Sequence, residues 1–327
     1  MGIDFKWGII GPGRIAHKFA EAVHKTKNAS IHAIASRSSK EPDKLRDDFG
    51  AEKFYDRYDA IVSDKEINAI YIATPHRFHH ENAKLCLEAG KPVLCEKSFT
   101  VNAKEAEELF NISREKGLFL MEALWTRFLP IYESIHEWIE AGEIGDVRHV
   151  YSTLGFVARR DPADRLLNID LAGGTVLDLG VYTHSMTQWV YGDQPKEIHA
   201  CGHIGETGVD ETVNVSYTYA NGDSAQFTCT FEFDPPNQIL IFGSAGRIRV
   251  HTSFYNGTEA TLEKGKQSKT IKKPFKINGF EYQIEAAMQA IRKGQLDCAQ
   301  MTQAATLANM RALDTIREQI GMHYPFE

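Results

Sequence analysis

Apolar and polar positions follow two periods along the first third of the chain. An apolar run at 7–10 leads into two glycines and a helical pattern over 14–25. Further short apolar runs lie at 31–35, 53–55, 69–73, 92–96 and 118–121. Helical patterns separate them at 41–49, from 56, at 78–89 and at 102–116. Continuous apolar strands that alternate with helices are typical of a parallel sheet covered on both faces. The pattern therefore predicts an α/β fold, a doubly wound parallel sheet of the Rossmann type, over residues 1–123.

The pattern changes after residue 123. Helical segments are expected at 131–141 and 181–190, with a long β-like run at 147–157 between them. From 196 to about 271 the period is two, and turn signals such as Asn221-Gly222 separate the runs. Two helices, 280–293 and 302–320, close the chain. We therefore predict a second domain over 124–327, of α+β type with a large, mainly antiparallel sheet, for substrate binding and dimerisation.

Composition limits the partners that the protein can have. The 327 residues carry a formal net charge of −7 and have a pI near 6.0, which argues against nucleic acid or an anionic membrane as a partner. No apolar stretch of about 18 residues and no secretory leader pattern is found, so we expect no membrane span and a cytoplasmic location. The five cysteines form no C-x-x-C pair, which favours reduced thiols.

The segment around which the chain is organised is WGIIGPGRIA at 7–16. Gly11, Gly13 and Ala16 give a G-x-G-x-x-A form of the dinucleotide-binding motif, in which glycines allow a tight turn and close approach of a pyrophosphate. The pyrophosphate is expected at the start of the following helix, at Arg14 and Ile15, where unpaired N–H groups and the helix dipole favour negative charge. A glycine turn needed only for packing is the alternative.

The end of the second strand bears on the choice of cofactor. An NAD enzyme usually has Asp or Glu there for the ribose 2′-hydroxyl, whereas this chain has Ser36-Arg37-Ser38. A guanidinium with adjacent hydroxyls suits a 2′-phosphate. We therefore predict NADP, with NAD less favoured. The alternative is that Arg37 is an ordinary surface residue.

Ligands of an open α/β sheet bind beyond the carboxyl ends of its strands, so the residues that follow each strand are candidates. The predicted cofactor contacts there are Thr74, Pro75, His76, His79, Glu96 and Lys97. Lys97 stands out because it ends a buried strand near the expected nicotinamide, although a surface lysine at the start of a loop is the alternative. A metal cluster of His76, His79, His80 and Glu81 is the less favoured interpretation, because no matching ligand pair is found elsewhere. We expect no metal.

A second group of candidate residues lies in Gly173-Gly174-Thr-Val-Leu-Asp178-Leu-Gly180-Val-Tyr182. Asp178 and Tyr182 are four residues apart in a helical pattern and can share one face. Hydride transfer to a carbonyl needs a proton donor, and a tyrosine hydroxyl can serve where a cation such as Lys97 stabilises its phenolate. In the alternative, Asp178 caps a helix and Tyr182 is a core aromatic.

These motifs together resemble the Gfo/Idh/MocA oxidoreductases. The resemblance rests on Gly11-Pro-Gly-Arg-Ile-Ala16, Ala73-Thr-Pro-His76 with His79, Ala89-Gly-Lys-Pro-Val-Leu-Cys-Glu-Lys97 and 173–182, and it spans nearly the whole chain. Within the family, 117–128 and 206–213 resemble the branch of dimeric trans-1,2-dihydrodiol dehydrogenases, which also oxidise D-xylose with NADP.

The resemblance implies a set of roles. Lys97 and Tyr182 would be catalytic, with Asp178 assisting and Tyr182 as acid/base. The large sheet would supply a homodimer interface through its open face. Ser98 stands where the family usually has proline, which leaves the geometry of that loop open.

The substrate is not fixed, because relatives act on sugars, anhydro-sugars, inositols and aromatic diols. Trp125, Phe156 and Phe280 are candidates for an apolar wall against a sugar ring or an arene diol. A non-catalytic NADP sensor, and a lyase or hydrolase that uses transient oxidation, are the alternative functions.

Overall fold

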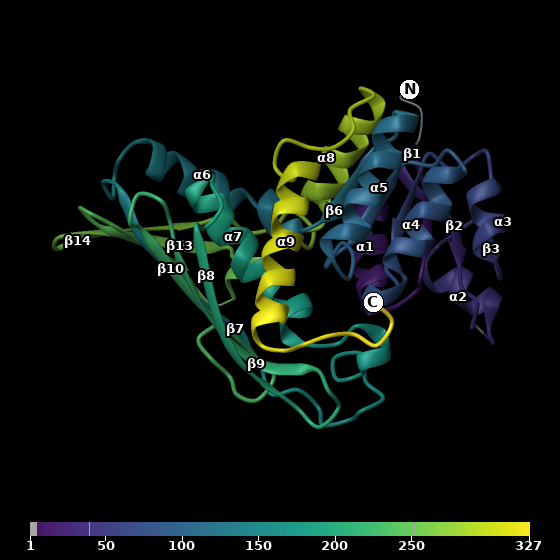
Figure 1. The fold of residues 1–327 in the computed structure, drawn as a ribbon. Helices are drawn as coiled ribbons and strands as arrows, with labels where there is room; N and C mark the ends of the chain where they lie inside the picture. Colours follow the sequence, from purple (N-terminus) through teal and green to yellow (C-terminus); the bar gives the residue numbers. More distant parts are fainter. Residues whose placement is uncertain (1–4, 39, 252) are drawn as a thin grey trace. The chain divides into compact units, whose positions relative to one another are not determined.

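The structure is a computed structural model that describes residues 5–38, 40–251 and 253–327. The chain divides into two compact units, Met1–Trp125 with Lys276–Leu307, and Thr126–Phe275 with Ala308–Glu327. Figure 1 traces the chain through both.

The first unit is built on a parallel sheet with the strand order β3-β2-β1-β4-β5-β6. Its strands are β1 (Phe5–Ile10), β2 (Ala29–Ala35), β3 (Lys53–Tyr55), β4 (Ala69–Ile72), β5 (Val93–Glu96) and β6 (Leu120–Ala123). Its helices are α1 (Arg14–Lys25), α2 (Pro42–Asp48), α3 (Tyr58–Ser63), the 3₁₀ turn η1 (His76–Phe78), α4 (His79–Glu88), α5 (Ala103–Lys116) and α8 (Glu281–Arg292). This order is that of a dinucleotide-binding Rossmann fold, whose order reverses between β1 and β4. The predicted doubly wound sheet is confirmed.

Packing within this unit follows the sequence pattern. The central strands β1, β4, β5 and β6 are mainly apolar and almost entirely buried, as expected where helices cover both faces of the sheet, whereas the short edge strand β3 is only half-buried. Phe19 of α1 stacks on Tyr71 of β4 with ring centroids 3.7 Å apart, which fixes α1 against the centre of the sheet. Asn102 accepts a hydrogen bond from the Glu105 N–H at the start of α5, and Gly117 ends that helix at φ +63°.

The second unit is built on a sheet with the order β14-β13-β12-β11-β7-β10-β9-β8. Its strands are β7 (Val147–Gly155), β8 (Glu197–Ile204), β9 (Asp210–Thr218), β10 (Ser224–Thr230), β11 (Ile239–Gly243), β12 (Arg247–Val250), β13 (Glu259–Lys264) and β14 (Gln267–Lys272). Its helical segments are α6 (Pro130–Glu140), a π-helical turn (Val176–Gly180), α7 (Val181–Tyr191) and most of α9 (Gln303–Gln319). All pairings among these strands are antiparallel except β7 with β10, which confirms the predicted sheet.

The two faces of this second sheet differ. Along β9, Val213, Val215 and Tyr217 are buried, whereas Thr212, Asn214, Ser216 and Thr218 on the opposite face are more exposed. The helix α7 packs on the buried face at β7 and β10. The sheet is therefore covered by helices of its own unit on one face, and the other face is polar.

One segment departs from the predicted division at 123. The chain returns to the first unit at Lys276–Leu307, a segment that we assigned to the second domain. The Leu120 N–H donates to the Leu296 carbonyl at 2.9 Å, Gln303 donates to Ser113 at 2.8 Å, and Asn278 donates to the Lys18 carbonyl at 2.9 Å. Nothing in the hydrophobic pattern of a helix says which sheet the helix covers.

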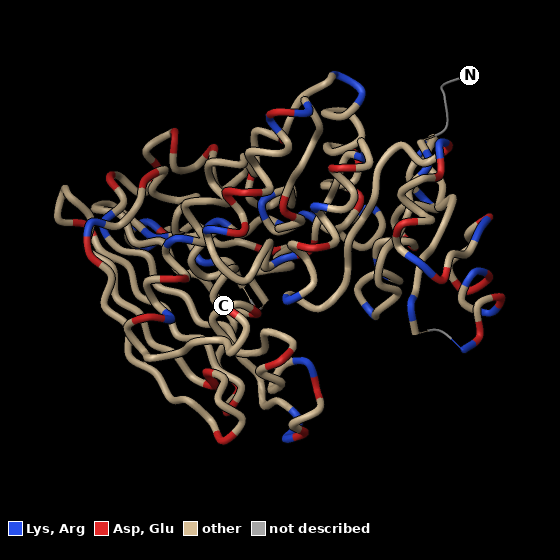
Figure 2. The backbone as a smooth tube through the Cα atoms, turned by 45° about the vertical axis from the view of Figure 1, so that its right-hand side comes forward, with Lys and Arg blue, Asp and Glu red and all other residues tan. Residues whose placement is uncertain are grey.

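Charged residues are interspersed by sign along the backbone in Figure 2. Among the described residues, no helix combines the length and the apolar character needed to cross a bilayer.

Candidate functional site

The turn after β1 requires glycine at its first position. Gly11 has φ +89°, and a Cβ there would lie 2.8 Å from the carbonyl carbon of Ala73 and 2.8 Å from the nitrogen of Thr74. Both the backbone angle and the close approach of the β4 end exclude a larger side chain. Glycine at position 11 therefore allows the ends of β1 and β4 to lie close together at the point where the strand order reverses.

Gly13, unlike Gly11, is not required by close packing within the protein. It directly precedes α1, and a Cβ there would meet only the Ala73 carbonyl oxygen, at 3.9 Å. The first turn of α1 contains no acidic residue, and the side chains of Arg14 and Ile15 are exposed. A helix start with open space before it and no carboxylate offers N–H groups and the positive dipole end to an anion. The residues present therefore fit a pyrophosphate.

Arg37 lies just beyond the end of β2, after the buried Ser36. Its guanidinium carbon is 4.6 Å from the ring centroid of Tyr58 and 5.8 Å from that of Phe78. One guanidinium nitrogen is 3.7 Å from a carboxylate oxygen of Glu81. The sequence pointed to Arg37 but not to its proximity to Tyr58, Phe78 and Glu81, because these residues belong to other elements.

His79 joins two of the predicted segments. Its ring is buried, with Nε2 2.7 Å from the Thr74 carbonyl oxygen and Nδ1 2.8 Å from the Ser98 carbonyl oxygen. Burial lowers the pKa of His79, while the hydrogen bonds to the Ser98 and Thr74 backbone oppose that shift. His76 is also buried, and its ring lies edge-on to that of His79 with centroids 5.7 Å apart. His79 thus ties the segment after β4 to the segment after β5, and its direct contact with a cofactor stays a prediction.

Glu96 and Lys97 end β5. The Glu96 carboxylate is buried, and it accepts hydrogen bonds from the Tyr71 hydroxyl and, at 3.3 Å, from the Lys97 N–H. The Lys97 side chain is half-buried at the carboxyl edge of the sheet, where the cofactor is expected. The peptide bond between Lys97 and Ser98 is cis.

Two of the three predicted wall residues are buried beneath a lysine. Trp125 is 4% exposed and Phe280 is 1% exposed, and their ring centroids are 4.9 Å apart. The Lys18 ammonium lies 4.0 Å from the Trp125 centroid and 5.0 Å from the Phe280 centroid. Burial lowers the pKa of Lys18, while Glu96 and Glu281 oppose that shift. Lys18 closes one face of Trp125, and a substrate contact by these rings stays a prediction.

Phe156, the third candidate, lies in the second unit just after β7. It is 37% exposed, and its ring packs against Phe231 at a centroid distance of 5.4 Å. Its exposure leaves it available to a ligand, in contrast to Trp125 and Phe280.

Asp178 and Tyr182 lie on consecutive helical segments of the second unit. Asp178 belongs to the π-helical turn, Tyr182 is the second residue of α7, and both are buried. Oδ1 of Asp178 accepts a hydrogen bond from Nη1 of Arg165 at 3.0 Å, and this carboxylate raises the pKa of Arg165. The Tyr182 ring lies 5.5 Å from that of Tyr255. The sequence analysis missed Arg165, which precedes the motif in an irregular segment.

A buried carboxylate fixes the start of this segment. Oδ2 of Asp210 accepts hydrogen bonds from the Thr175 hydroxyl and the Val176 N–H, each at 2.7 Å. A Cβ at Gly174 would lie 2.3 Å from Oδ1 of Asp210, so only glycine fits there. Burial raises the pKa of Asp210 to about 6.

The helix that carries Tyr182 is held farther along by Arg127. Its guanidinium donates to the hydroxyl and the carbonyl oxygen of Ser185, at 2.8 and 2.7 Å, and to the side chain of Gln188 at 2.6 Å. Nδ1 of the neighbouring His184 forms a hydrogen bond of 2.8 Å with the Tyr217 hydroxyl. Burial lowers the pKa of His184 to about 3. Asp210 thus holds the segment that precedes Tyr182 in the sequence, and Arg127 holds the part of α7 that follows it.

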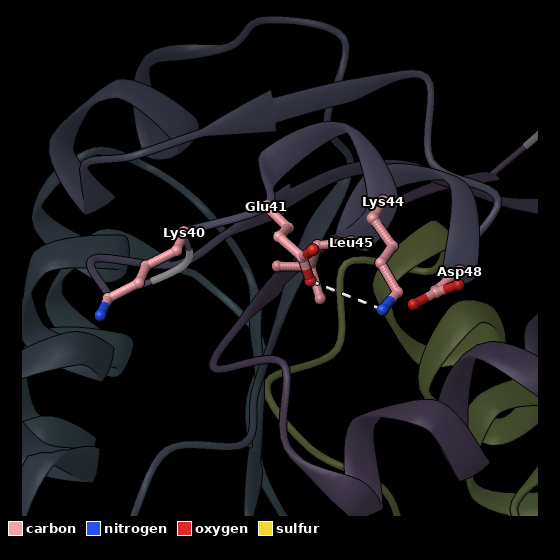
Figure 3. Close-up of a pocket in the computed structure, with 5 residues that line it drawn as sticks. All are labelled: Lys40, Glu41, Lys44, Leu45 and Asp48. Carbon is pink, nitrogen blue, oxygen red and sulfur yellow. Dashed lines mark hydrogen bonds and ion pairs between the residues drawn. The ribbon is translucent and has the colours of Figure 1, made fainter.

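Other groups of polar side chains have simpler roles. A shallow surface pocket on α2 is lined by Lys40, Glu41, Lys44, Leu45 and Asp48 (Figure 3). Lys44 lies 3.5 Å from Glu41 there, and Lys40 points away from the others. Two clusters have spacing suited to a metal, His32 with Asp64 and Glu66, and His203 with Glu211 and Glu232. In each cluster a carboxylate is already paired with a basic side chain, Lys53 in the first and Arg160 in the second. We therefore interpret both clusters as networks of ion pairs.

Two family models match the chain, and each matches one of the two sheets. One, described as an oxidoreductase family with an NAD-binding Rossmann fold, matches residues 5–124, and the other, the GFO/IDH/MocA C-terminal domain, matches residues 132–249. Mouse trans-1,2-dihydrobenzene-1,2-diol dehydrogenase is 32% identical over 98% of both chains. The chain belongs to the Gfo/Idh/MocA oxidoreductase family. It is therefore an enzyme, an NAD(P)-binding dehydrogenase or reductase.

Solved structures share the fold of this chain. A 3-ketoreductase from Actinomadura kijaniata, crystallised with NADP and TDP-benzene, is 25% identical, with a TM-score of 0.88 over 97% of this chain and 98% of that one. The aldose-aldose oxidoreductase from Caulobacter crescentus, 20% identical with a TM-score of 0.88 over 97% of each chain, shows the fold alone. These likenesses confirm the predicted fold, and the family models with the curated relative confirm the predicted family.

Proposed function

We propose that this protein is an NADP-dependent dehydrogenase that transfers a hydride between the nicotinamide and a secondary alcohol or hemiacetal carbon of an aldose or a cyclic vicinal diol. The observation that carries the proposal is the 32% identity with mouse trans-1,2-dihydrobenzene-1,2-diol dehydrogenase across 98% of both chains. The sugar alternative draws on the shared fold of the aldose-aldose oxidoreductase from Caulobacter crescentus.

The preference for NADP is supported by Arg37. A planar guanidinium near two aromatic rings, at the end of β2, suits the 2′-phosphate that distinguishes NADP from NAD. Gly13 and the start of α1 would hold the pyrophosphate, and Thr74, Pro75 and His76, which follow β4, would border the cofactor. When bound, the cofactor supplies the hydride chemistry, and the protein supplies position and proton handling.

The proton is assigned to Tyr182. Its hydroxyl donates to the developing alkoxide in reduction and accepts a proton from the substrate hydroxyl in oxidation. A tyrosine has an unperturbed pKa of about 10, so a phenolate near neutral pH needs a cation, and Lys97 is proposed to supply it. Asp178, held by Arg165, assists by orienting the substrate hydroxyl or Lys97.

The alternative function is a non-catalytic NADP sensor on the same fold. It would keep the glycine turn and Arg37 while making no use of Tyr182. The presence of both Lys97 and Tyr182 favours catalysis.

The test is the initial rate of NADPH formation from NADP with D-xylose, other aldoses and cyclic trans-diols, in the wild type and in Tyr182→Phe. Turnover on one substrate class that disappears in Tyr182→Phe supports the proposal and identifies the class. Tight NADP binding with no turnover on any of these substrates, in either direction, would favour the sensor.

We also propose that the protein is a homodimer formed through the polar face of the second sheet. On this face Thr228 of β10 donates to Asn214 of β9 at 2.8 Å, halfway along the two paired strands. Light scattering should give about twice the 36.8 kDa chain mass. In the proposed dimer, Thr228→Arg would place like charges of the two copies opposite each other across the interface. The variant should therefore be a monomer. A monomeric wild type would contradict the proposal.

A further inference from the structure

An acidic side chain lies beside the arginine that we assign to the 2′-phosphate. Glu81 is in the first turn of α4, and its Oε1 is 3.7 Å from Nη2 of Arg37. Both side chains are about half exposed, 53% for Arg37 and 55% for Glu81. The chain thus carries a carboxylate beside the end of β2, where an NAD enzyme usually has one, but this carboxylate comes from α4.

The pair between these two residues is weak enough to open. A half-exposed ion pair at this distance contributes little stability, because water screens it and two flexible side chains must be ordered. Arg37 does not depend on Glu81 for its position, since its guanidinium also rests against the rings of Tyr58 and Phe78. A ligand that binds Arg37 more strongly can therefore displace Glu81.

We propose that Glu81 competes with the 2′-phosphate of NADP for Arg37, and that this competition sets how strongly the enzyme prefers NADP over NAD. The inference rests on the proposed function, because it requires the 2′-phosphate to bind Arg37. A phosphate monoester carries between one and two negative charges near pH 7, so a neighbouring carboxylate both repels it and occupies its partner. The 2′-hydroxyl of NAD has no charge and can donate to that carboxylate. Glu81 therefore weakens NADP binding and leaves NAD binding unchanged or slightly stronger.

Removing the Glu81 charge should consequently strengthen NADP binding. A screened repulsion between a carboxylate and a phosphate about 5 Å apart at the surface corresponds to about a three- to tenfold change in affinity. The effect should shrink as salt is raised, because the interaction is between exposed charges.

The experiment is a calorimetric titration of the full-length protein with NADP, NAD and 2′,5′-ADP, in the wild type, Glu81→Gln and Glu88→Gln. Glu88 is the matched control, since it ends the same helix about 10 Å away along the axis and its substitution makes the same change in net charge. We expect Glu81→Gln to bind NADP and 2′,5′-ADP about three- to tenfold more tightly and NAD within about twofold of the wild type. Glu88→Gln should match the wild type. Unchanged or weaker NADP binding in Glu81→Gln would overturn the inference.

Arg37→Gln separates this inference from the proposed function. If NADP affinity does not fall in Arg37→Gln, the assignment of the 2′-phosphate to Arg37 is wrong, whatever Glu81 does. If it falls and Glu81→Gln has no effect, only the competition is wrong. In the Arg37→Gln background the gain from Glu81→Gln should be smaller than in the wild type. An equal gain would show that Glu81 acts without Arg37 and would overturn the competition.

Discussion

Arg165 donates a hydrogen bond to Asp178 at 3.0 Å, so the carboxylate predicted to assist Tyr182 is already paired with a cation of its own unit. Asp178 is buried, and a buried carboxylate that loses its partner is costly to keep ionised. The pair therefore keeps Asp178 charged and in place for its proposed role.

We expect Arg165→Met to lower kcat about tenfold, because Asp178 would lose its orientation and its favoured ionised form. NADP affinity should stay the same. Steady-state rates between pH 5 and 9 with a cofactor titration measure both effects.

Arg159→Met is the matched control. Arg159 lies in the same segment, is exposed, and has only a 3.6 Å contact with Asp161 among the ion pairs of the described residues. It should leave the rate profile unchanged. An equal loss of activity in both variants would assign the effect to the segment rather than to the pair.

Tyr182→Phe should lower turnover by about 10²- to 10⁴-fold, the usual contribution of a positioned acid/base. NADP affinity should be unchanged, because the glycine turn and Arg37 belong to the first unit and Tyr182 to the second. Tyr191→Phe is the control on the same helix. It removes a hydrogen bond to the Ser224 carbonyl, which costs about 1 kcal/mol of stability without affecting turnover. Turnover of Tyr182→Phe near that of the wild type would rule out its acid/base role.

The two glycines of the turn should respond to alanine in opposite ways. Gly11→Ala should destabilise the protein by about 2–4 kcal/mol, because φ is +89° and the new Cβ would meet the backbone at 2.8 Å. Gly13→Ala has room for its methyl group in the protein itself, with the nearest atom at 3.9 Å. It should melt within a few degrees of the wild type but bind NADP at least about tenfold more weakly, since the methyl group would occupy the pyrophosphate position. Wild-type NADP affinity in Gly13→Ala would place the pyrophosphate elsewhere.

Much of the fold was predictable because its determinants are local. Buried strands such as Tyr71 and its neighbours are continuously apolar, and Asn102 and Gly117 mark the ends of α5 by capping chemistry. The return of Lys276–Leu307 to the first unit was not predictable, because the choice between two apolar surfaces depends on shape. The π-helical turn that contains Asp178 was read as ordinary helix, since its sequence has no distinguishing pattern.

The candidate site was predictable only for residues within motifs. Gly11, Arg37, Lys97 and Tyr182 were found from their spacing and from the ends of strands. Their partners Glu81 and Arg165, like Lys18 and Asp210, lie far away in the sequence or outside any motif, so only the folded chain brings them together. Sequence reasoning thus finds the residues proposed to do chemistry and misses those that hold or modulate them.

Asp210 should give the second unit a pH-dependent stability. Burial raises its pKa to about 6, so the folded state keeps the proton to a higher pH than the unfolded state, in which an Asp titrates near 3.9. For a raised pKa, the stability contribution is fully present below the unfolded value and is lost as pH rises through the folded value. Asp210→Asn keeps an oxygen that can accept both hydrogen bonds but cannot titrate, so its deficit in stability relative to the wild type should be largest at pH 4. Between pH 4 and 7 that deficit should shrink by up to about 3 kcal/mol, the equivalent of about two pKa units.

Urea unfolding of both proteins between pH 4 and 7.5 measures the difference, and other titrating groups cancel because they are common to both. Asp210→Ala separates charge from hydrogen bonding, since it also leaves the Thr175 hydroxyl and the Val176 N–H without their acceptor. It should be destabilised across the whole range and should lose turnover, because these two groups start the segment that leads to Asp178 and Tyr182. A stability difference between the wild type and Asp210→Asn that stays constant with pH would mean that Asp210 remains ionised in the folded protein, held so by the Thr175 and Val176 hydrogen bonds and by nearby Arg317.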